Sequence, residues 1–227
     1  MVSRIVSGIM VAFLLVGMLT LAFNIRPVKA SGTIYIRADG SIDPSDAPIS
    51  TVDNVTYTLT GNITCDVDGI IVERDNIILE GAGYAIQETV GYDMSGICLD
   101  GRSEVTIKNV TILKFKKGVS LISSSNNSIV GNNITNNFCG VTIVSSSSNN
   151  SISGNNITNN ITGIALLTPS SNNKIFHNNF INNNIQVLSD SADIWDDGYP
   201  SGGNYWSDYT GADLYNGPTR MYLVVME

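Results

Sequence analysis

The sequence predicts an all-β protein that folds as a right-handed parallel β-helix of about five to six coils, 22–23 residues each, with N-terminal capping strands. Three observations predict this fold. Motifs recur at a spacing of 22 or 23 residues, apolar residues alternate with Ser, Thr and Asn, and most of the apolar residues are β-branched. A period of two is typical of strands, and β-branched side chains suit a pleated sheet.

Two motifs carry the repeat: a Ser-Ser-Asn-Asn-x-Ile run, and a glycine followed by apolar-x-apolar. Self-similarity at a fixed period of this length marks a solenoid, in which each coil stacks on the previous one. The first motif begins at Ser124, Ser147 and Ser170. The glycines of the second are Gly69, Gly96, Gly118, Gly140 and Gly163, and a further coil at Val187 has no glycine. The leucine ladder of a leucine-rich repeat is missing, which favours the β-helix.

Stacking predicts the core, because equivalent residues of successive coils should lie about 4.8 Å apart and form columns. We expect three inward columns: Ile97, Val119, Val141 and Ile164; Leu99, Leu121, Ile143 and Leu166; and Ile107, Ile129, Ile152 and Ile175. The residues between the first two columns should face outward, which would place Cys98 near the surface. These residues are Cys98, Ser120, Thr142 and Ala165.

The many asparagines keep register with the coils. Asn tolerates the left-handed conformation of tight turns, and stacked amides hydrogen-bond along a ladder. We expect ladders at Asn133, Asn156 and Asn179 and at Asn137, Asn160 and Asn183. Several asparagines also begin Asn-x-Ser/Thr acceptor sequences for glycosylation, and those buried in a ladder would be unavailable to it. These acceptors are Asn54, Asn62, Asn109, Asn126, Asn133, Asn149, Asn156 and Asn160.

Residues 1–30 predict a signal peptide, with basic Arg4, an uncharged stretch from Ile5 to Phe23, and a small-x-small ending before Ser31. The uncharged stretch is also long enough to stay as an uncleaved membrane anchor, which would be the chain's link to the membrane. Either way we expect the domain in the extracellular space, on the cell surface or in a periplasm-like space. Residues 31–67 are expected to form N-terminal capping strands, 68–194 the β-helix repeats, and 195–227 an aromatic, Gly- and Asp-rich C-terminal cap.

The formal net charge is −8, and it becomes more negative if the basic residues of the first 30 are removed. An acidic surface repels phosphate backbones, so we expect no nucleic-acid partner. The three cysteines, Cys65, Cys98 and Cys139, are an odd number and form no CxxC pair, so they give no complete disulfide framework.

The C-terminal region suggests a binding site. Aromatic side chains gather there among Gly and Asp, and the candidates for carbohydrate binding are Trp195, Tyr199, Tyr205, Trp206 and Tyr209. The alternative is a cap that covers the last coil, because an open coil end exposes unpaired strand edges. We expect no resident cofactor. The alternative is a calcium ion held by Asp196, Asp197 or Asp208.

Catalysis has weaker support. Glycoside hydrolysis needs two carboxylates at a set distance, and the charged residues near one strand have no matching carboxylates on later coils. They are Asp66, Asp68, Glu73, Arg74 and Asp75. Copper sites are built from His, Cys and Met, and His177 is the single histidine. We therefore expect no copper site and no catalytic residues.

Several stretches resemble the NosD-type periplasmic copper-binding β-helix proteins, in particular their archaeal secreted and surface branch. They are Asp68–Asn76, Glu80–Tyr84, the Asn-Ile-Thr-Asn-Asn coils, His177–Asn183 and Trp195–Tyr209, within Ile34 to Pro218. The resemblance implies a right-handed parallel β-helix outside the cytoplasm. Tails of this family usually continue beyond a Leu-Tyr-x-Gly-Pro run with an acidic, glycine-rich segment, so the stretch after Pro218 looks shortened.

The sequence therefore predicts an exported, non-catalytic β-helix protein for cell-surface structure, adhesion or glycan binding. Its expected partners are extracellular glycans or other cell-envelope components. A polysaccharide lyase or glycoside hydrolase is the first alternative. An accessory factor in periplasmic copper-enzyme maturation is the second, and it rests on the family resemblance.

Overall fold

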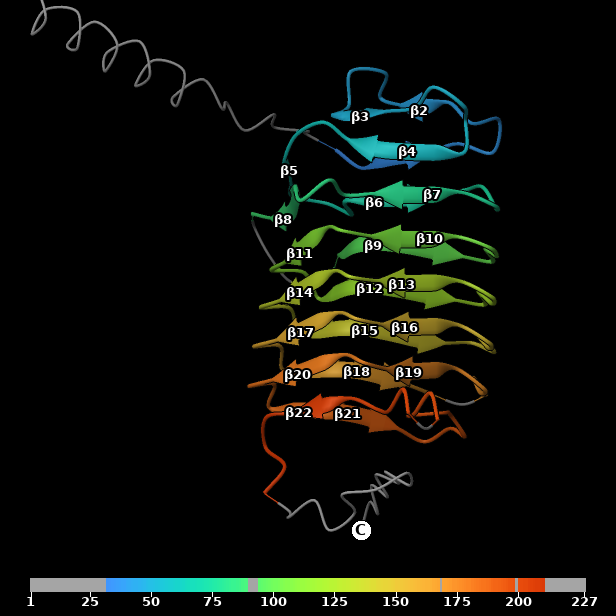
Figure 1. Ribbon diagram of the computed structural model, residues 1–227. Helices are drawn as coiled ribbons and strands as arrows, with labels where there is room; N and C mark the ends of the chain where they lie inside the picture. The colour runs from blue at the N-terminus through green and yellow to red at the C-terminus, as the bar shows by residue number, and fades with distance from the viewer. Residues whose placement is uncertain (1–31, 90–93, 168, 199, 211–227) are drawn as a thin grey trace, which may run out of the picture.

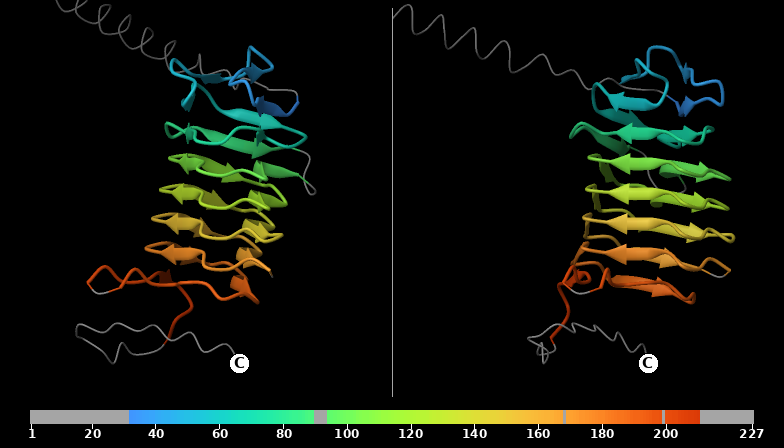
Figure 2. Two further views of the ribbon diagram at one scale, coloured as in Figure 1. Left: turned by 90° about the vertical axis from the view of Figure 1, so that its right-hand side faces the viewer. Right: turned by 45° about the vertical axis from the view of Figure 1, so that its right-hand side comes forward.

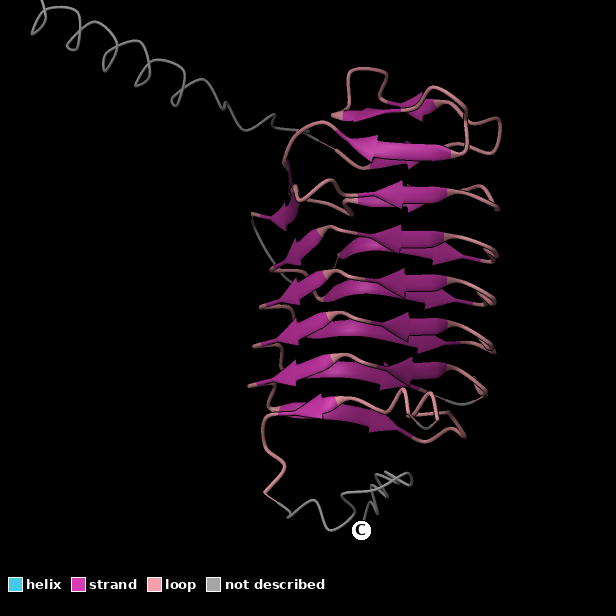
Figure 3. Ribbon diagram, viewed as in Figure 1, coloured by secondary structure: helices cyan, strands magenta, loops and turns pink. Residues whose placement is uncertain are grey.

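The chain folds as a right-handed parallel β-solenoid of about six turns (Figure 1). The computed structural model describes residues 32–89, 94–167, 169–198 and 200–210. The predicted signal peptide or anchor and residues 211–227 of the predicted cap lie outside these ranges. The described residues form strands joined by loops and turns (Figure 3). They contain no helix with the length and apolarity needed to span a membrane. The predicted fold class is confirmed.

Each coil contributes one strand to each of three sheets. Sheet 1 runs in the order β2 (Ile42–Asp43), β1 (Ile34–Ile36), β6 (Ile70–Val72), β9 (Ser95–Asp100), β12 (Lys117–Ile122), β15 (Cys139–Val144), β18 (Thr162–Leu166) and β21 (Ile185–Ser189). Sheet 2 runs β19 (Lys174–Phe176), β16 (Ser151–Ser153), β13 (Ser128–Val130), β10 (Thr106–Lys108), β7 (Ile78–Glu80), β4 (Thr56–Leu59) and β3 (Ile49–Ser50). Sheet 3 runs β22 (Tyr205–Trp206), β20 (Asn179–Ile181), β17 (Asn156–Thr158), β14 (Asn133–Thr135), β11 (Thr111–Leu113), β8 (Ala85–Glu88) and β5 (Ile63–Cys65).

Three N-terminal strands extend the parallel stack, and two shorter strands pair antiparallel at its end. β1, β4 and β5 pair in parallel with β6, β7 and β8, whereas β2 and β3 pair antiparallel with β1 and β4. The coils stack along one axis with little offset between successive turns (Figure 2).

The three predicted core columns are confirmed by the strand register. Val119 pairs with Val141, which pairs with Ile164, and the other two columns stack in the same way. All twelve side chains are fully buried. Since burying one large aliphatic side chain stabilises a fold by about 1.5–3 kcal/mol, these columns supply much of the stability.

The residues between the first two columns differ from expectation. They alternate with the inward residues, but Ser120 is 0% exposed and Thr142 and Ala165 are each 8% exposed. Only Cys98 among the four keeps intermediate exposure. The outward alternation therefore holds, but three of the four residues are covered rather than exposed.

The repeated glycines mark the corner where sheet 3 turns into sheet 1. A Cβ on Gly118 would lie 2.5 Å from the carbonyl oxygen of Gly140, and a Cβ on Gly140 would lie equally close to that of Gly163. The same contact recurs at Gly69, Gly96 and Gly163. The last coil has Gln186 at this position. No later coil follows there within the described residues, so a side chain has room.

Buried asparagine ladders line the turns. One predicted ladder, Asn137–Asn160–Asn183, is confirmed, with each Nδ2 donating to the Oδ1 of the next coil. Two further ladders were not predicted: Asn127–Asn150–Asn173 and Asn132–Asn155–Asn178–Asn204. The other predicted ladder, Asn133–Asn156–Asn179, lies in strands and is exposed.

Candidate functional site

The two tryptophans lie at the end of the stack and pack against the core. The Trp206 ring stacks on the Phe180 ring at a centroid distance of 4.4 Å and an interplanar angle of 9°. Trp195 lies against Trp206, with ring centroids 6.2 Å apart. Both rings are partly buried against the core. Phe180 is fully buried, so these tryptophans cover the inside of the last coil.

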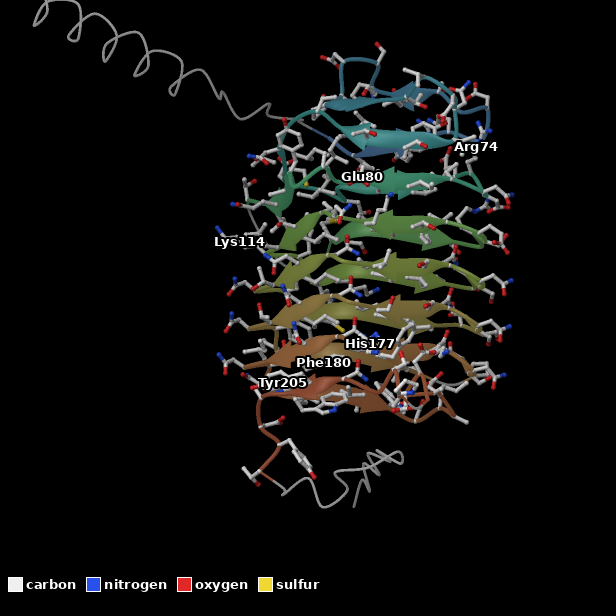
Figure 4. All side chains as sticks on the ribbon, in the orientation of Figure 1. Arg74, Glu80, Lys114, His177, Phe180 and Tyr205 are labelled. Carbon is white, nitrogen blue, oxygen red and sulfur yellow. The ribbon has the colours of Figure 1, made fainter. Side chains whose placement is uncertain are left out.

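The tyrosines of the same region are placed differently. Tyr205 is 58% exposed and Tyr209 is 55% exposed, while Tyr199 lies outside the described residues. Tyr205 is in β22 and pairs in register with Asn179 of β20. Figure 4 labels Tyr205 and Phe180, which lie at the C-terminal end of the stack. The structure therefore separates the five predicted residues into an inner tryptophan pair and outer tyrosines.

The outer surface of sheet 3 carries regular columns of polar side chains. Asn133, Asn156, Asn179 and Tyr205 follow one another in register on β14, β17, β20 and β22. Their inward neighbours Ile134, Ile157 and Phe180 are fully buried. We call this surface the amide face; beside the first column it has a second, consisting of Thr135, Thr158 and Ile181.

Hydrogen bonds within the amide face orient its polar groups. The Nδ2 of Asn179 donates to the Oδ1 of Asn156 at 2.7 Å, and the hydroxyl of Thr158 donates to that of Thr135 at 2.9 Å. A primary amide has two N–H donors and an acceptor oxygen, so each asparagine keeps groups for a ligand. The columns contain no charged residue. They therefore offer a flat, neutral surface of donors and acceptors that ends at an exposed tyrosine ring.

Sequence reasoning had assigned Asn133, Asn156 and Asn179 to turns. The signal that could have placed them correctly is the Asn-Ile-Thr pattern itself. If the central Ile points inward in a strand, then Asn and Thr project together from the outer face.

The predicted calcium ligands do not come together. Asp197 forms an ion pair with Lys174 and accepts a hydrogen bond from the Ser201 hydroxyl at 2.9 Å. The Lys174 ammonium, aided by this hydroxyl, holds the pKa of Asp197 below its usual range. Asp196 accepts from the backbone N–H of Gly198. In the described part of the chain, no group of three His, Cys, Asp or Glu side chains could hold a metal ion, with Asp208 included.

His177 belongs to the same local contacts. Its Nε2 lies 2.8 Å from the carbonyl oxygen of Ser201 and 3.2 Å from the Ser201 hydroxyl, which donates a hydrogen bond to Asp197 at 2.9 Å. Together with Lys174, these contacts join Asp197 and Ser201 to the preceding coil.

The charged residues around β6 also make structural contacts. Asp68 accepts from the backbone N–H of Ser95 at 2.6 Å, and Asp75 accepts from that of Ser103 at 2.9 Å. Glu73 pairs with Arg37 at 3.1 Å. Each carboxylate therefore holds a turn or a neighbouring coil.

The three cysteines are free thiols on different coils. Burial raises the pKa of the Cys65 thiol to about 12 and that of Cys98 to about 11, and it also raises the pKa of Cys139. Thiols with raised pKa values are protonated at neutral pH and are poor nucleophiles and metal ligands.

Comparison with known proteins identifies the family. The model of the family described as "Periplasmic copper-binding protein (NosD)" matches residues 27–211. The chain belongs to the NosD family. Its β-helix fold and the family's periplasmic description agree with the expected location outside the cytoplasm.

Other comparisons add little to the NosD assignment. A search of curated proteins gives no match. Among solved structures, the chain is similar to the "tailspike protein 2 enzymatically active domain" of bacteriophage CBA120, with 12% identity and a TM-score of 0.35. The match covers 79% of this chain and 33% of that one, so the chain spans about a third of its length.

The described residues do not suit the copper named in the NosD family description. His177 is held by Ser201, and the three cysteines lie on separate coils with raised thiol pKa values. Copper binds to clustered His, Cys or Met ligands. The described donor groups do not fit such a site, and no step proposed below involves copper.

Proposed function

We propose that this NosD-family chain is an exported, non-catalytic β-helix module that binds glycans of the cell envelope through its amide face. The observation that carries the proposal is the register of Tyr205 with Asn179, Asn156 and Asn133. The exposed ring lies at the end of a straight column of amides on one flat surface.

The chemistry of this surface suits a sugar. A pyranose has an apolar face of C–H groups and a rim of hydroxyls, so it stacks on an aromatic ring and exchanges hydrogen bonds with planar amides. An exposed tyrosine offers apolar area together with a polar hydroxyl. The columns bear no charge, which favours a neutral glycan over a charged one.

A glycan panel tests the proposal. The purified domain should retain neutral cell-envelope glycans without releasing new reducing or unsaturated ends. Tyr205→Ala should weaken retention at least about tenfold, or ~1.4 kcal/mol, and Asn156→Ala should weaken it too. Tyr84→Ala is the matched control, because Tyr84 is also exposed but lies five coils away from Tyr205.

Two results would count against the proposal. Retention unaffected by Tyr205→Ala would place binding elsewhere. Product release would instead favour the alternative of a lyase or hydrolase.

A further inference from the structure

The chemical groups of the amide face repeat along the solenoid axis. In that direction Asn133, Asn156 and Asn179 follow one another in register, one on each coil (Figure 1). Across the face the groups change, because Asn156 is followed on its own strand by the outward Thr158. A ligand built from one repeated unit therefore meets the same amide at each step if it lies along the axis, and different groups if it lies across the face.

The step of the column fits a sugar chain. Parallel strands lie about 4.8 Å apart, and each pyranose of an extended glycan, with its linking oxygen, lengthens the chain by a similar distance. The column from Asn133 to Tyr205 contains three such steps, or about 14 Å, and therefore has room for about four sugars. The coils stack with little offset, so the column is straight (Figure 2).

The column is bounded at both ends. On the two earlier coils, Thr111 of β11 and Ala85 of β8 take the asparagine position. Neither side chain carries an amide, and both are shorter than asparagine. At the other end Tyr205 follows Asn179, and its ring is exposed. A ligand on this column is therefore expected to begin at an aromatic ring and to lose its amide contacts beyond Asn133.

A second row of asparagines lies beside the amide face, at the corner where sheet 3 ends. Its members are exposed, are spaced 23 residues apart and have positive φ angles of 56°, 55° and 54°: Asn136, Asn159 and Asn182. The backbone N–H of Asn136 donates to the carbonyl of Thr158 on the next coil, and that of Asn159 donates to the carbonyl of Ile181. This corner row therefore runs parallel to the amide column and adds further amides along the same axis.

The linkage of a glycan decides whether it can follow a straight column. Equatorial 1,4 linkages give an extended ribbon, whereas the axial linkage of an α-1,4-glucan makes the chain coil away from a flat surface. We propose that the amide face binds an extended, neutral β-1,4-linked glycan parallel to the solenoid axis, with one sugar per coil. One sugar stacks on the ring of Tyr205, and the next three hydrogen-bond to the asparagines of the column. This inference rests on the proposed glycan-binding function.

A length series tests the orientation. Calorimetry on the full chain uses β-1,4-linked oligosaccharides of glucose and of N-acetylglucosamine, from two to six units long. In the series that binds more tightly, Kd should fall about fivefold with each unit up to four, the gain from one net hydrogen bond, and then level off. An α-1,4-linked glucose tetramer should bind at least about tenfold more weakly. The protein is produced without N-glycosylation, because Asn133 and Asn156 begin acceptor sequences.

Two variants at the far end of the column sharpen the test. Asn133→Ala should weaken binding of the four-unit ligand about fivefold and leave that of the two-unit ligand unchanged, because a two-unit chain stacked on Tyr205 does not reach that coil. Thr111→Asn adds an amide one coil further along and should move the plateau from four units to five. Both residues lie on the outer side of sheet 3, and thermal unfolding checks that each variant is folded.

The outcomes separate this inference from the proposed function. A Kd that levels off at two units, or that is unchanged by Asn133→Ala at four units, would overturn the axial orientation while glycan binding at Tyr205 stands. Binding of other neutral glycans without either β-1,4-linked series, or equal affinity for the α-linked tetramer, would overturn the linkage. Retention of no glycan at all would remove the proposed function and this inference with it.

Discussion

The carbonyl oxygen of Gly140 lies 2.5 Å from the point that a Cβ on Gly118 would occupy. Because the obstacle is backbone on the next coil, it cannot rotate away as a side chain could. Each corner glycine is therefore required by the coil stacked on it, and the requirement ends at the last described coil.

Gly118→Ala should lower the free energy of unfolding by about 3 kcal/mol or more, at the upper end of the cost of overpacking. Gln186→Ala, at the same corner on the last coil, should change it by less than about 0.5 kcal/mol. Chemical denaturation of both variants checks the difference. Equal effects would show that the corner at Gly118 can accommodate a side chain.

The buried ladder should be far more sensitive than the exposed one. Asn155 Nδ2 donates to the carbonyl of Ile129 and to Asn178, and its Oδ1 accepts from the backbone N–H of Asn132. Asn155→Ala leaves several buried groups unpaired at about 1–3 kcal/mol each, so we expect a loss of at least about 3 kcal/mol. Asn156→Ala, one residue later and exposed, should cost less than about 0.5 kcal/mol. Similar losses at both positions would contradict the assignment of the ladders.

Neighbouring aromatic residues should separate stability from binding. Trp206→Ala removes the ring that stacks on Phe180 and should destabilise the domain by roughly 2–4 kcal/mol, somewhat below the cost of truncating a fully buried Trp. Tyr205→Ala should leave the melting temperature nearly unchanged. Thermal unfolding monitored by circular dichroism checks both. A large loss at Tyr205 would mean that its ring also supports the fold.

Thiol chemistry should follow the raised pKa values. In the folded protein at pH 8, Cys65, Cys98 and Cys139 should react with a thiol reagent much more slowly than in denaturant, where three thiols should be counted. Their folded pKa values exceed the unfolded value of about 8.5. Their contribution to stability is thus fully present below about pH 8.5 and is lost as the pH rises towards 11–12. A titration in denaturant that counts fewer thiols would reveal a disulfide.

The Lys174–Asp197 pair should make the terminal loop sensitive to acid. The pKa of Asp197 is lowered in the fold, so its contribution is present above the unfolded value of about 3.9 and is lost as the pH falls below it. The effect should be small because the pair is partly exposed. Asp197→Asn should melt below the unchanged protein at pH 6 and equally at pH 2. A difference that persists at pH 2 would assign the effect to packing.

The sequence by itself determined the fold class, the coil length and the three apolar columns. Each coil repeats the same local pattern, so the residue stacked on Val141 is its counterpart 22 or 23 positions away. In a solenoid, sequence spacing and spatial contact carry the same information. The glycine column and one asparagine ladder followed from the same repeat.

Only the tertiary structure decided which side chains are covered and which are open. Alternation placed Ser120 outward, yet its side chain is completely buried. Tyr205 and Trp206 are adjacent, and the repeat gives no sign that Trp206 stacks on Phe180 while Tyr205 lies on the amide face. These outcomes depend on how the last turn closes over the stack. The contacts that close the last turn are made by residues outside the repeat, so the repeat pattern cannot predict these contacts.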